Sequence, residues 1–303
     1  MALQPEPVQD MAPVAKPEKH EMKAKKMWID SLLRIVKSKT SFIGLLIIVI
    51  LLVTALFAPL IATQDPTAQS IVDRYQSPSG KHILGTDELG RDIFSRIVYG
   101  TRISIQIGLI SVGISLVIGV LLGGIAGFFG RWLDQIIMRI IDIMMAFPSI
   151  LLAIALVAVL GPSLRNAMIA VGIVGIPQFA RIVRGAVLSV KETEYIEAAR
   201  AIGAKNARIL GQHVLPNCVA PIIVQATLGI GTAILDAAGL SFLGLGAQPP
   251  SPEWGAMLSD GRSALQTAPW VITFPGIAIF LVVLGFNLFG DGLRDALDPR
   301  LKQ

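Results

Sequence analysis

Several residue types on which most enzymes and nucleic-acid-binding proteins depend are scarce in this 303-residue sequence. The single cysteine, Cys218, excludes an internal disulfide and a metal cluster held by several thiolates. The three histidines, His20, His82 and His213, lie in separate segments, so they are not expected to bind one metal together. Aromatic residues make up 6% of the chain and do not alternate with basic residues, so the net charge of +5 does not indicate nucleic-acid binding.

Sequence motifs of known catalytic chemistry are also missing. The chain has no His-Glu-x-x-His helix, no Gly-x-Ser-x-Gly turn and no G-x-x-x-x-G-K-[ST] phosphate loop. We therefore expect no catalytic residue, no metal and no cofactor bound by this chain. A cleavable signal peptide is not expected either, because residues 1–40 are polar and rich in proline and lysine, and a long apolar run follows them.

Charged residues, at 16%, are too few for a soluble domain, in which they make up about a quarter. Hydrophobic residues make up 53% and are concentrated in runs of roughly 20, the length of a bilayer-spanning helix. The sequence therefore predicts an all-α polytopic membrane protein. Six transmembrane helices are expected, at about residues 42–62, 102–128, 137–160, 164–182, 218–238 and 270–290.

Lysine and arginine are concentrated in every second segment between the predicted helices. They are frequent in residues 1–41, 183–217 and 291–303, whereas acidic residues outnumber them in residues 63–101. Basic segments stay on the cytoplasmic side of a membrane. We therefore predict that both terminal tails are cytoplasmic, and that 63–101 and the later loop at 239–269 are extracytoplasmic.

Uncharged residues mark two candidate sites. Gly119, Gly123 and Gly127 share one helix face, which favours close packing between helices and leaves the lining of a translocation path as the alternative. Trp254 lies in the second outward loop, where tryptophan is typical of the membrane interface. Contact of Trp254 and Gly255 with a partner protein is the alternative interpretation.

Two carboxylates lie inside the predicted helices, where an unpaired charge costs several kcal/mol. Asp142 is expected to pair with Arg139, three residues earlier on the same helix face. Asp236 has no basic neighbour in the local sequence. A position in headgroup water and a position facing a hydrated path inside the bundle therefore both remain open for Asp236.

Residues 197–217 read EAARAIGAKNARILGQHVLPN and form a polar interruption between two apolar runs. Glu197 suits the positive end of a helix dipole, and the alanines favour a helix of little bulk. Gly203 permits a turn, Pro216 stops helix propagation and Asn217 can cap the helix that follows. The segment is either a compact helix–turn–helix that docks on a partner or a solvated amphipathic loop.

The same segment resembles the EAA loop of bacterial ABC importer permeases. The matching residues are Glu197, Ala198, Ala199, Gly203, Ile209, Leu215, Pro216 and Asn217. Three further stretches, at 82–108, 241–258 and 287–303, are similar to the C-type subunit of the dipeptide and oligopeptide transport family. The resemblance extends from about residue 30 to the C-terminus.

This resemblance implies a type I ABC importer permease, with one helix before a MetI-like core of five helices at 102–290. It implies a bacterial inner-membrane protein that pairs with a homologous B-type permease subunit and two ATPase subunits, which bind ATP and Mg. An extracytoplasmic solute-binding protein would deliver the substrate. The EAA loop, at about 190–217, would couple the ATPases to the path.

The substrate implied by the resemblance is a di- or oligopeptide. Relatives with similar motifs carry glutathione, nickel complexes or haem, so the same machine with another substrate remains open. A transporter that acts alone is the alternative from a different class, although no inverted repeat is visible in the sequence.

Overall fold

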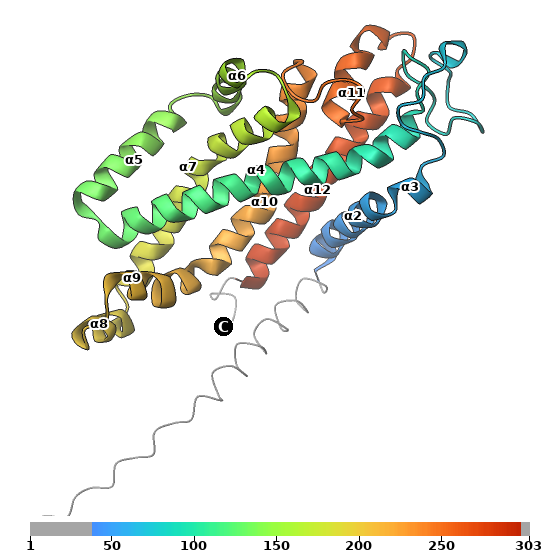
Figure 1. Ribbon diagram of the computed structural model, residues 1–303. Helices are drawn as coiled ribbons and strands as arrows, with labels where there is room; N and C mark the ends of the chain where they lie inside the picture. The colour runs from blue at the N-terminus through green and yellow to red at the C-terminus, as the bar shows by residue number, and fades with distance from the viewer. Residues whose placement is uncertain (1–37, 298–303) are drawn as a thin grey trace, which may run out of the picture.

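The computed structural model describes residues 38–297, which form helices joined by loops (Figure 1). Most of the predicted N-terminal tail, at 1–37, and the last residues, 298–303, lie outside the described part. The α-helices are α2 (Lys39–Leu56), α3 (Ala58–Ile61), α4 (Ile93–Phe129), α5 (Arg131–Met145), α6 (Ser149–Leu160), α7 (Leu164–Lys191), α8 (Glu194–Ala201), α9 (Asn206–Arg208), α10 (Val219–Phe242), α11 (Trp254–Gly261) and α12 (Trp270–Leu297).

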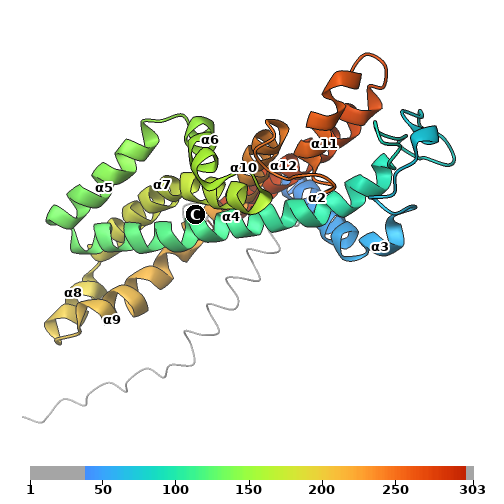
Figure 2. The ribbon, with the colours of Figure 1, turned by 45° about the horizontal axis from the view of Figure 1, so that its top comes forward.

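The long helices run side by side between two ends of the molecule. Helices α8 and α9 lie at one end, and α11 with the loop at 62–92 lies at the other, in both views (Figures 1 and 2). Within residues 38–297, five helical stretches are long and apolar enough to cross a membrane, and there are six if α5 and α6 together form one bent span. The prediction of an all-helical polytopic protein is confirmed.

The third predicted span, at 137–160, is not one continuous helix. Helices α5 and α6 meet at 93°, with residues 146–148 between them. Pro148 explains the break, because proline disfavours a helical conformation in the residue before it and donates no backbone hydrogen bond. Three other predicted boundaries also differ from the structure. Helix α4 begins at Ile93, before the predicted start at 102, and α12 continues to Leu297 through the start of the predicted C-terminal tail. Helix α2 ends at Leu56, before the predicted end at 62.

Helix α5 carries polar residues on one face, and these pair with α7. Arg184 donates to both carboxylate oxygens of Asp134, at 2.5 and 2.7 Å. Arg181 donates to Asp142 at 2.6 Å. The predicted pairing of Asp142 with Arg139 is therefore wrong, because the arginine that reaches Asp142 comes from the neighbouring helix.

The three glycines of α4 lie against α7 without an intervening cavity. A Cβ atom at Gly119 would lie 2.4 Å from the Phe179 Cβ, and one at Gly123 would lie 2.3 Å from the Ala180 carbonyl oxygen. At Gly127 it would meet backbone and side-chain atoms of α7 at 2.9 to 3.0 Å. These residues are closely packed, so the structure supports the packing interpretation and gives them no place in a path wall.

Candidate functional site

Helix α8 ends in a turn at Gly203, where the backbone conformation favours glycine. Gly203 has a φ of +82°. Its N–H donates to the Arg200 carbonyl at 2.9 Å, and the next N–H, of Ala204, donates to the Ala199 carbonyl at 3.1 Å. This pair of bonds is the Schellman motif, in which a left-handed residue satisfies the last carbonyls of a helix. The turn reverses the chain into α9.

A buried apolar cluster fixes this helix–turn–helix to the ends of the long helices. Ile196 on α8 and Ile209 after α9 are both 0% exposed. They pack with Phe128 at the end of α4 and with Val183 and Val187 on α7. These contacts join α8 to two of the long helices. The EAA loop is therefore neither solvated on all sides nor free to move independently.

The outer surface of α8 is small and exposed. Glu197, Ala198 and Gly203 all face outward, while Ala199 is half-buried against the cluster below. Ile202 follows α8 directly and is 86% exposed, although its side chain is large and apolar. An apolar residue surrounded by alanine and glycine gives a smooth surface on which another protein can dock.

The Leu215-Pro216-Asn217 end of the loop differs from the prediction in the contacts of Asn217. These residues lie in a 3-10 turn, Leu215–Cys218, which precedes α10. The Asn217 side chain donates to the His213 carbonyl at 2.7 Å and to the Tyr195 hydroxyl at 3.2 Å. The prediction that Asn217 caps α10 is therefore wrong. Its amide instead ties the start of α10 to α8.

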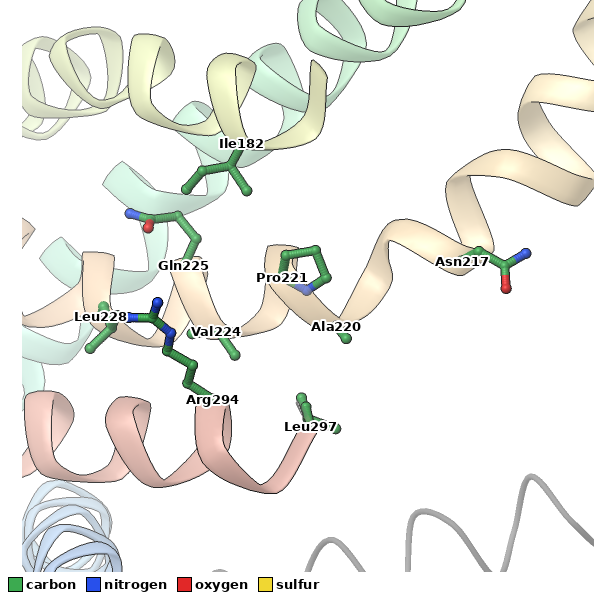
Figure 3. A pocket seen from close by; sticks show the side chains of 9 residues that line it. All are labelled: Ile182, Asn217, Ala220, Pro221, Val224, Gln225, Leu228, Arg294 and Leu297. Atoms are coloured by element: carbon green, nitrogen blue, oxygen red, sulfur yellow. The ribbon is translucent and has the colours of Figure 1, made fainter. Parts of the chain in front are cut away.

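A cavity of about 520 Å³ lies at the same end of the molecule, between α7, α10 and α12 (Figure 3). Its polar lining comes from Asn217, Gln225 and Arg294, and the remaining lining is apolar. Figure 3 shows the Arg294 guanidinium reaching from α12 towards α10.

A second, smaller cavity of about 210 Å³ lies further along α10, with α4, α7 and the start of α6 as its other walls. Asp236, Thr232 and Gln225 line it from α10, and Gln178 lines it from α7. The structure thus places Asp236 at a hollow that also holds the exposed side chains of Thr232 and Gln178. Gln225 also lines the first cavity, and Gln225, Thr232 and Asp236 form a polar strip along α10.

At the opposite end, buried charges fasten the loop at 62–92 to the helices. Arg91 is 2% exposed and donates to Asp87 at 2.6 Å and to Asp260 at 3.2 Å. Asp92 caps α4 by accepting from the Ser95 N–H at 2.9 Å. The polar residues of this loop are therefore largely used in holding it together.

Trp254 and Gly255 are part of the same packed end. The Trp254 side chain is 1% exposed, and its indole N–H donates to the Ile97 carbonyl at 3.1 Å. A Cβ atom at Gly255 would lie 2.3 Å from the Ala238 carbonyl oxygen. Both residues are buried, so the structure leaves neither of them available to a partner protein and places Trp254 in the core rather than at a membrane interface.

Comparison with known proteins places these features in a family. The profile described as "Binding-protein-dependent transport system inner membrane component" matches residues 119–303. A second, described as "N-terminal TM domain of oligopeptide transport permease C", matches residues 26–78. The chain belongs to the binding-protein-dependent inner-membrane transport components. It is a permease of the ABC importer class, whose members work with ATPase subunits and a binding protein.

Relatives of this permease align along nearly its whole length. It is 55% identical over 296 residues to the dipeptide transport system permease protein DppC of Alkalihalophilus pseudofirmus, covering 98% of this chain and 97% of the relative. It is 50% identical over 276 residues to the glutathione transport system permease protein GsiD of Pectobacterium atrosepticum, covering 91% and 92%.

A solved structure agrees with the fold. A chain of the MetNI methionine ABC transporter, in an inward-facing conformation, aligns with a TM-score of 0.56 at 22% identity, covering 67% of this permease and 97% of that chain. The fold is that of a type I importer permease, as the sequence predicted.

Four exposed or cavity-lining residues of this permease do not stand out in the sequence as candidate site residues. Ile202 follows α8 next to the motif glycine, but an isoleucine in an apolar chain gives no signal of its own. Gln178 and Gln225 are polar residues inside apolar helices, and that pattern is the signal by which they could be found. Arg294 is recognisable in the sequence only as a basic residue near the C-terminus.

Proposed function

We propose that this chain is the C-type permease subunit of an ATP-driven importer that moves di- and oligopeptides into the cytoplasm. The identity of 55% to a dipeptide permease over almost the whole chain supports the substrate class. Membership of the family supports the proposed partners, which are a homologous B-type permease subunit, two ATPase subunits that bind ATP and Mg, and an extracytoplasmic solute-binding protein.

The observation that carries this proposal is the exposed, small-residue surface of α8 on a buried base. An ATPase that closes on ATP must move the permease by direct contact, because the chain itself has no phosphate-binding loop. Ala198 and Gly203 let a partner approach closely, and Ile202 offers an apolar contact at the centre. Ile196 then transmits the displacement to α4 and α7 as one body.

The orientation follows from this assignment. ATPases act in the cytoplasm, so α8, α9 and both chain termini lie on the cytoplasmic side, and the loop at 62–92 with α11 lies outside. The binding protein then meets the outer end. Ile71 and Val72 are 85% and 91% exposed there and are better placed for contact than the buried Trp254.

The polar strip along α10 is the wall of the translocation path. Its side chains are Gln225, Thr232 and Asp236, with Gln178 of α7 beside them. A wall of this kind cannot face lipid hydrocarbon without a cost of several kcal/mol. We therefore place the homologous permease subunit against this side of the chain, with a hydrated path between the two.

Glutathione is the second candidate substrate, because a glutathione permease is 50% identical over 91% of this chain. Glutathione is itself a peptide with a free ammonium group, so the path wall does not distinguish it from a dipeptide. The selectivity between glutathione and a dipeptide therefore lies with the binding protein that delivers the substrate.

The test is ATP-dependent uptake by the reconstituted complex. Proteoliposomes that hold this chain, its B-type partner and both ATPases should accumulate dipeptide when the loaded binding protein and ATP are supplied. Uptake by this chain alone, driven by a proton gradient, would contradict the proposal.

A pair of glycine variants tests the docking surface. Gly203→Asp should abolish uptake and release the ATPases during purification, with membrane insertion intact. Gly211→Asp places the same charge in an exposed, open position eight residues further along the same loop and should leave uptake within about twofold. Normal uptake by Gly203→Asp would remove the role assigned to α8.

A further inference from the structure

Asp236 belongs to a single polar face of α10. Gln225, Gly229, Thr232 and Asp236 are separated by four, three and four residues, so they lie above one another along the helix. All four line the cavity of about 210 Å³. At 1.5 Å per residue, Asp236 and Gln225 stand about 16 Å apart along the helix axis.

The other walls add hydrogen-bonding groups without adding a charge. Gln178 projects from α7 and is exposed, and Ser149 projects from the start of α6. Ser115 of α4 already donates to the Gly172 carbonyl at 2.6 Å, so it belongs to the packing rather than to the hollow. Asp236 is therefore the one ionisable residue among those that line this cavity.

Asp236 has no partner of opposite charge within the described part of the chain. Residues 38–297 give it neither an ion pair nor a hydrogen bond, and the arginines of α7 at 181 and 184 are engaged by Asp142 and Asp134. A carboxylate in a membrane helix is stable only when it is hydrated or meets a cation. The hollow, at about 210 Å³, is large enough for several waters around a charged group.

We propose that Asp236 is the counter-charge for the α-ammonium group of a peptide in transit. This inference rests on the proposed function and specifies the chemistry of its path. An ammonium group is the one positive charge that short peptides of any sequence carry, and the glutamine amides beside Asp236 match the donors and acceptors of peptide bonds. A site of this kind recognises the peptide class without recognising its side chains.

The larger cavity, of about 520 Å³, suggests the order in which a peptide would meet the two charges. Gln225 lines both hollows, and Arg294 lines the one nearer to α8. A peptide whose ammonium group leaves Asp236 therefore next meets an arginine, which attracts its carboxylate and repels its ammonium group. Asp236 on α10 and Arg294 on α12 line different cavities, so the two opposite charges act in turn rather than together.

The first experiment asks whether Asp236 faces water and attracts cations. Thr232 lies one helical turn before Asp236 and is exposed in the cavity. Thr232→Cys is made in a Cys218→Ala background, which removes the one native thiol. The assembled complex is treated with methanethiosulfonates that carry either a trimethylammonium or a sulfonate group.

The cationic reagent should modify the thiol of the Thr232→Cys complex at least about tenfold faster than the anionic one, since an unpaired carboxylate raises the local cation concentration. Adding Asp236→Asn should bring the modification rates of the two reagents close together. An excess of free dipeptide should protect the thiol better than the N-acetylated dipeptide does. A thiol that reacts with neither reagent, or with both equally, would overturn the inference.

The second experiment measures transport. Asp236→Asn should lower dipeptide uptake by about tenfold or more, as expected for the loss of the charge that attracts the ammonium group, while the loaded binding protein still stimulates ATP hydrolysis. Asp236→Glu should restore much of the uptake. Asp295→Asn, at an exposed carboxylate of α12, is the matched control and should transport normally.

The experiments distinguish a failure of the role of Asp236 from a failure of the proposed transport function. Normal uptake by Asp236→Asn would overturn the role of Asp236 and leave the importer intact. A wild-type complex that takes up no peptide would overturn the proposed function, and the thiol ratios would still decide whether Asp236 faces water.

Discussion

Gly203 ends α8 with a φ of +82°, a conformation that costs most other residues about 1–2 kcal/mol. Nothing lies within 4 Å of the position of its Cβ, so the cost of a substitution there comes from the backbone and not from a clash. Asparagine tolerates the left-handed conformation, whereas the β-branched valine does not. We therefore expect Gly203→Asn to keep uptake within about threefold and Gly203→Val to lose about tenfold.

The measurement for this pair is ATP-dependent uptake together with co-purification of the ATPases. If the conformation of the turn sets the docking surface, both readouts decline together in Gly203→Val. Equal activity of the two variants would mean that the turn is not needed for coupling.

Glu253 lies at a helix start outside the membrane spans and is buried. Its carboxylate accepts from the Gly255 and Ala256 N–H groups at 3.0 and 2.8 Å and so caps α11. Burial raises the pKa of the Glu253 carboxyl above its ordinary value, although the two backbone hydrogen bonds act against the shift. The folded chain then holds this proton more tightly than the unfolded chain, so its contribution to stability falls as the pH rises through the raised pKa.

The expected result is a pH-dependent difference between the wild type and Glu253→Gln. The apparent unfolding temperature of the wild type, relative to this variant, should fall as the pH rises from about 4 to about 7. Asp65 provides the contrast, because hydrogen bonds from Thr67 lower the pKa of its exposed carboxyl. Its replacement by asparagine should give a smaller difference of the opposite sign.

Most residues of the loop motif could be found from the sequence because backbone chemistry restricts them. Gly203 and Pro216 suit only a few conformations, and local spacing already indicates a turn and a helix stop. The actual partners of Asn217 and Asp142 could not be found in this way. Asn217 bonds to Tyr195, and Asp142 bonds to Arg181, 39 residues away, so both pairings depend on how helices pack.

Helices α4 and α7 approach each other so closely because glycine removes the side chain between them. At Gly123 an added Cβ would lie 2.3 Å from a backbone carbonyl oxygen of α7, which has no rotamer to change. At Gly113, on the same helix, nothing lies within 4 Å. We expect Gly123→Ala to destabilise the chain by about 1–3 kcal/mol, whereas Gly113→Ala should be neutral or slightly stabilising.

The measurement for these two variants is thermal unfolding of the purified complex and its yield from membranes. Because both substitutions are the same change in one helix, helix propensity cancels between them. Equal stability would mean that the helices can separate at Gly123 without cost.

The order of the long apolar helices could be read from apolar runs, since a bilayer fixes the length of a span. The bend between α5 and α6 could not be predicted from the sequence, because one straight span and two short helices can have the same apolar composition. Pro148 lies at the break. A proline inside a membrane helix can also be tolerated, as Pro177 in α7 shows, so the sequence alone does not decide between a kink and an end.

The two ends of the molecule are built differently. One end holds α8 on a buried apolar cluster, and the other holds a loop pinned by buried ion pairs. The polar hollows lie between these ends along α10. This arrangement fits a permease in which a push at one end changes the access to a path that is open to a binding protein at the other.

The orientation of the two ends can be tested because the chain has one cysteine, and it is buried. In the Cys218→Ala background, Gly80→Cys places a thiol in the loop at 62–92, and Lys205→Cys places one between α8 and α9. Both positions are exposed. A membrane-impermeant maleimide applied to intact spheroplasts should label position 80 and leave position 205 unlabelled, and permeabilised cells should give label at both. Label at position 205 in intact spheroplasts would reverse the topology, and with it the site at which ATPases can dock, because α8 would then face away from the compartment that holds ATP.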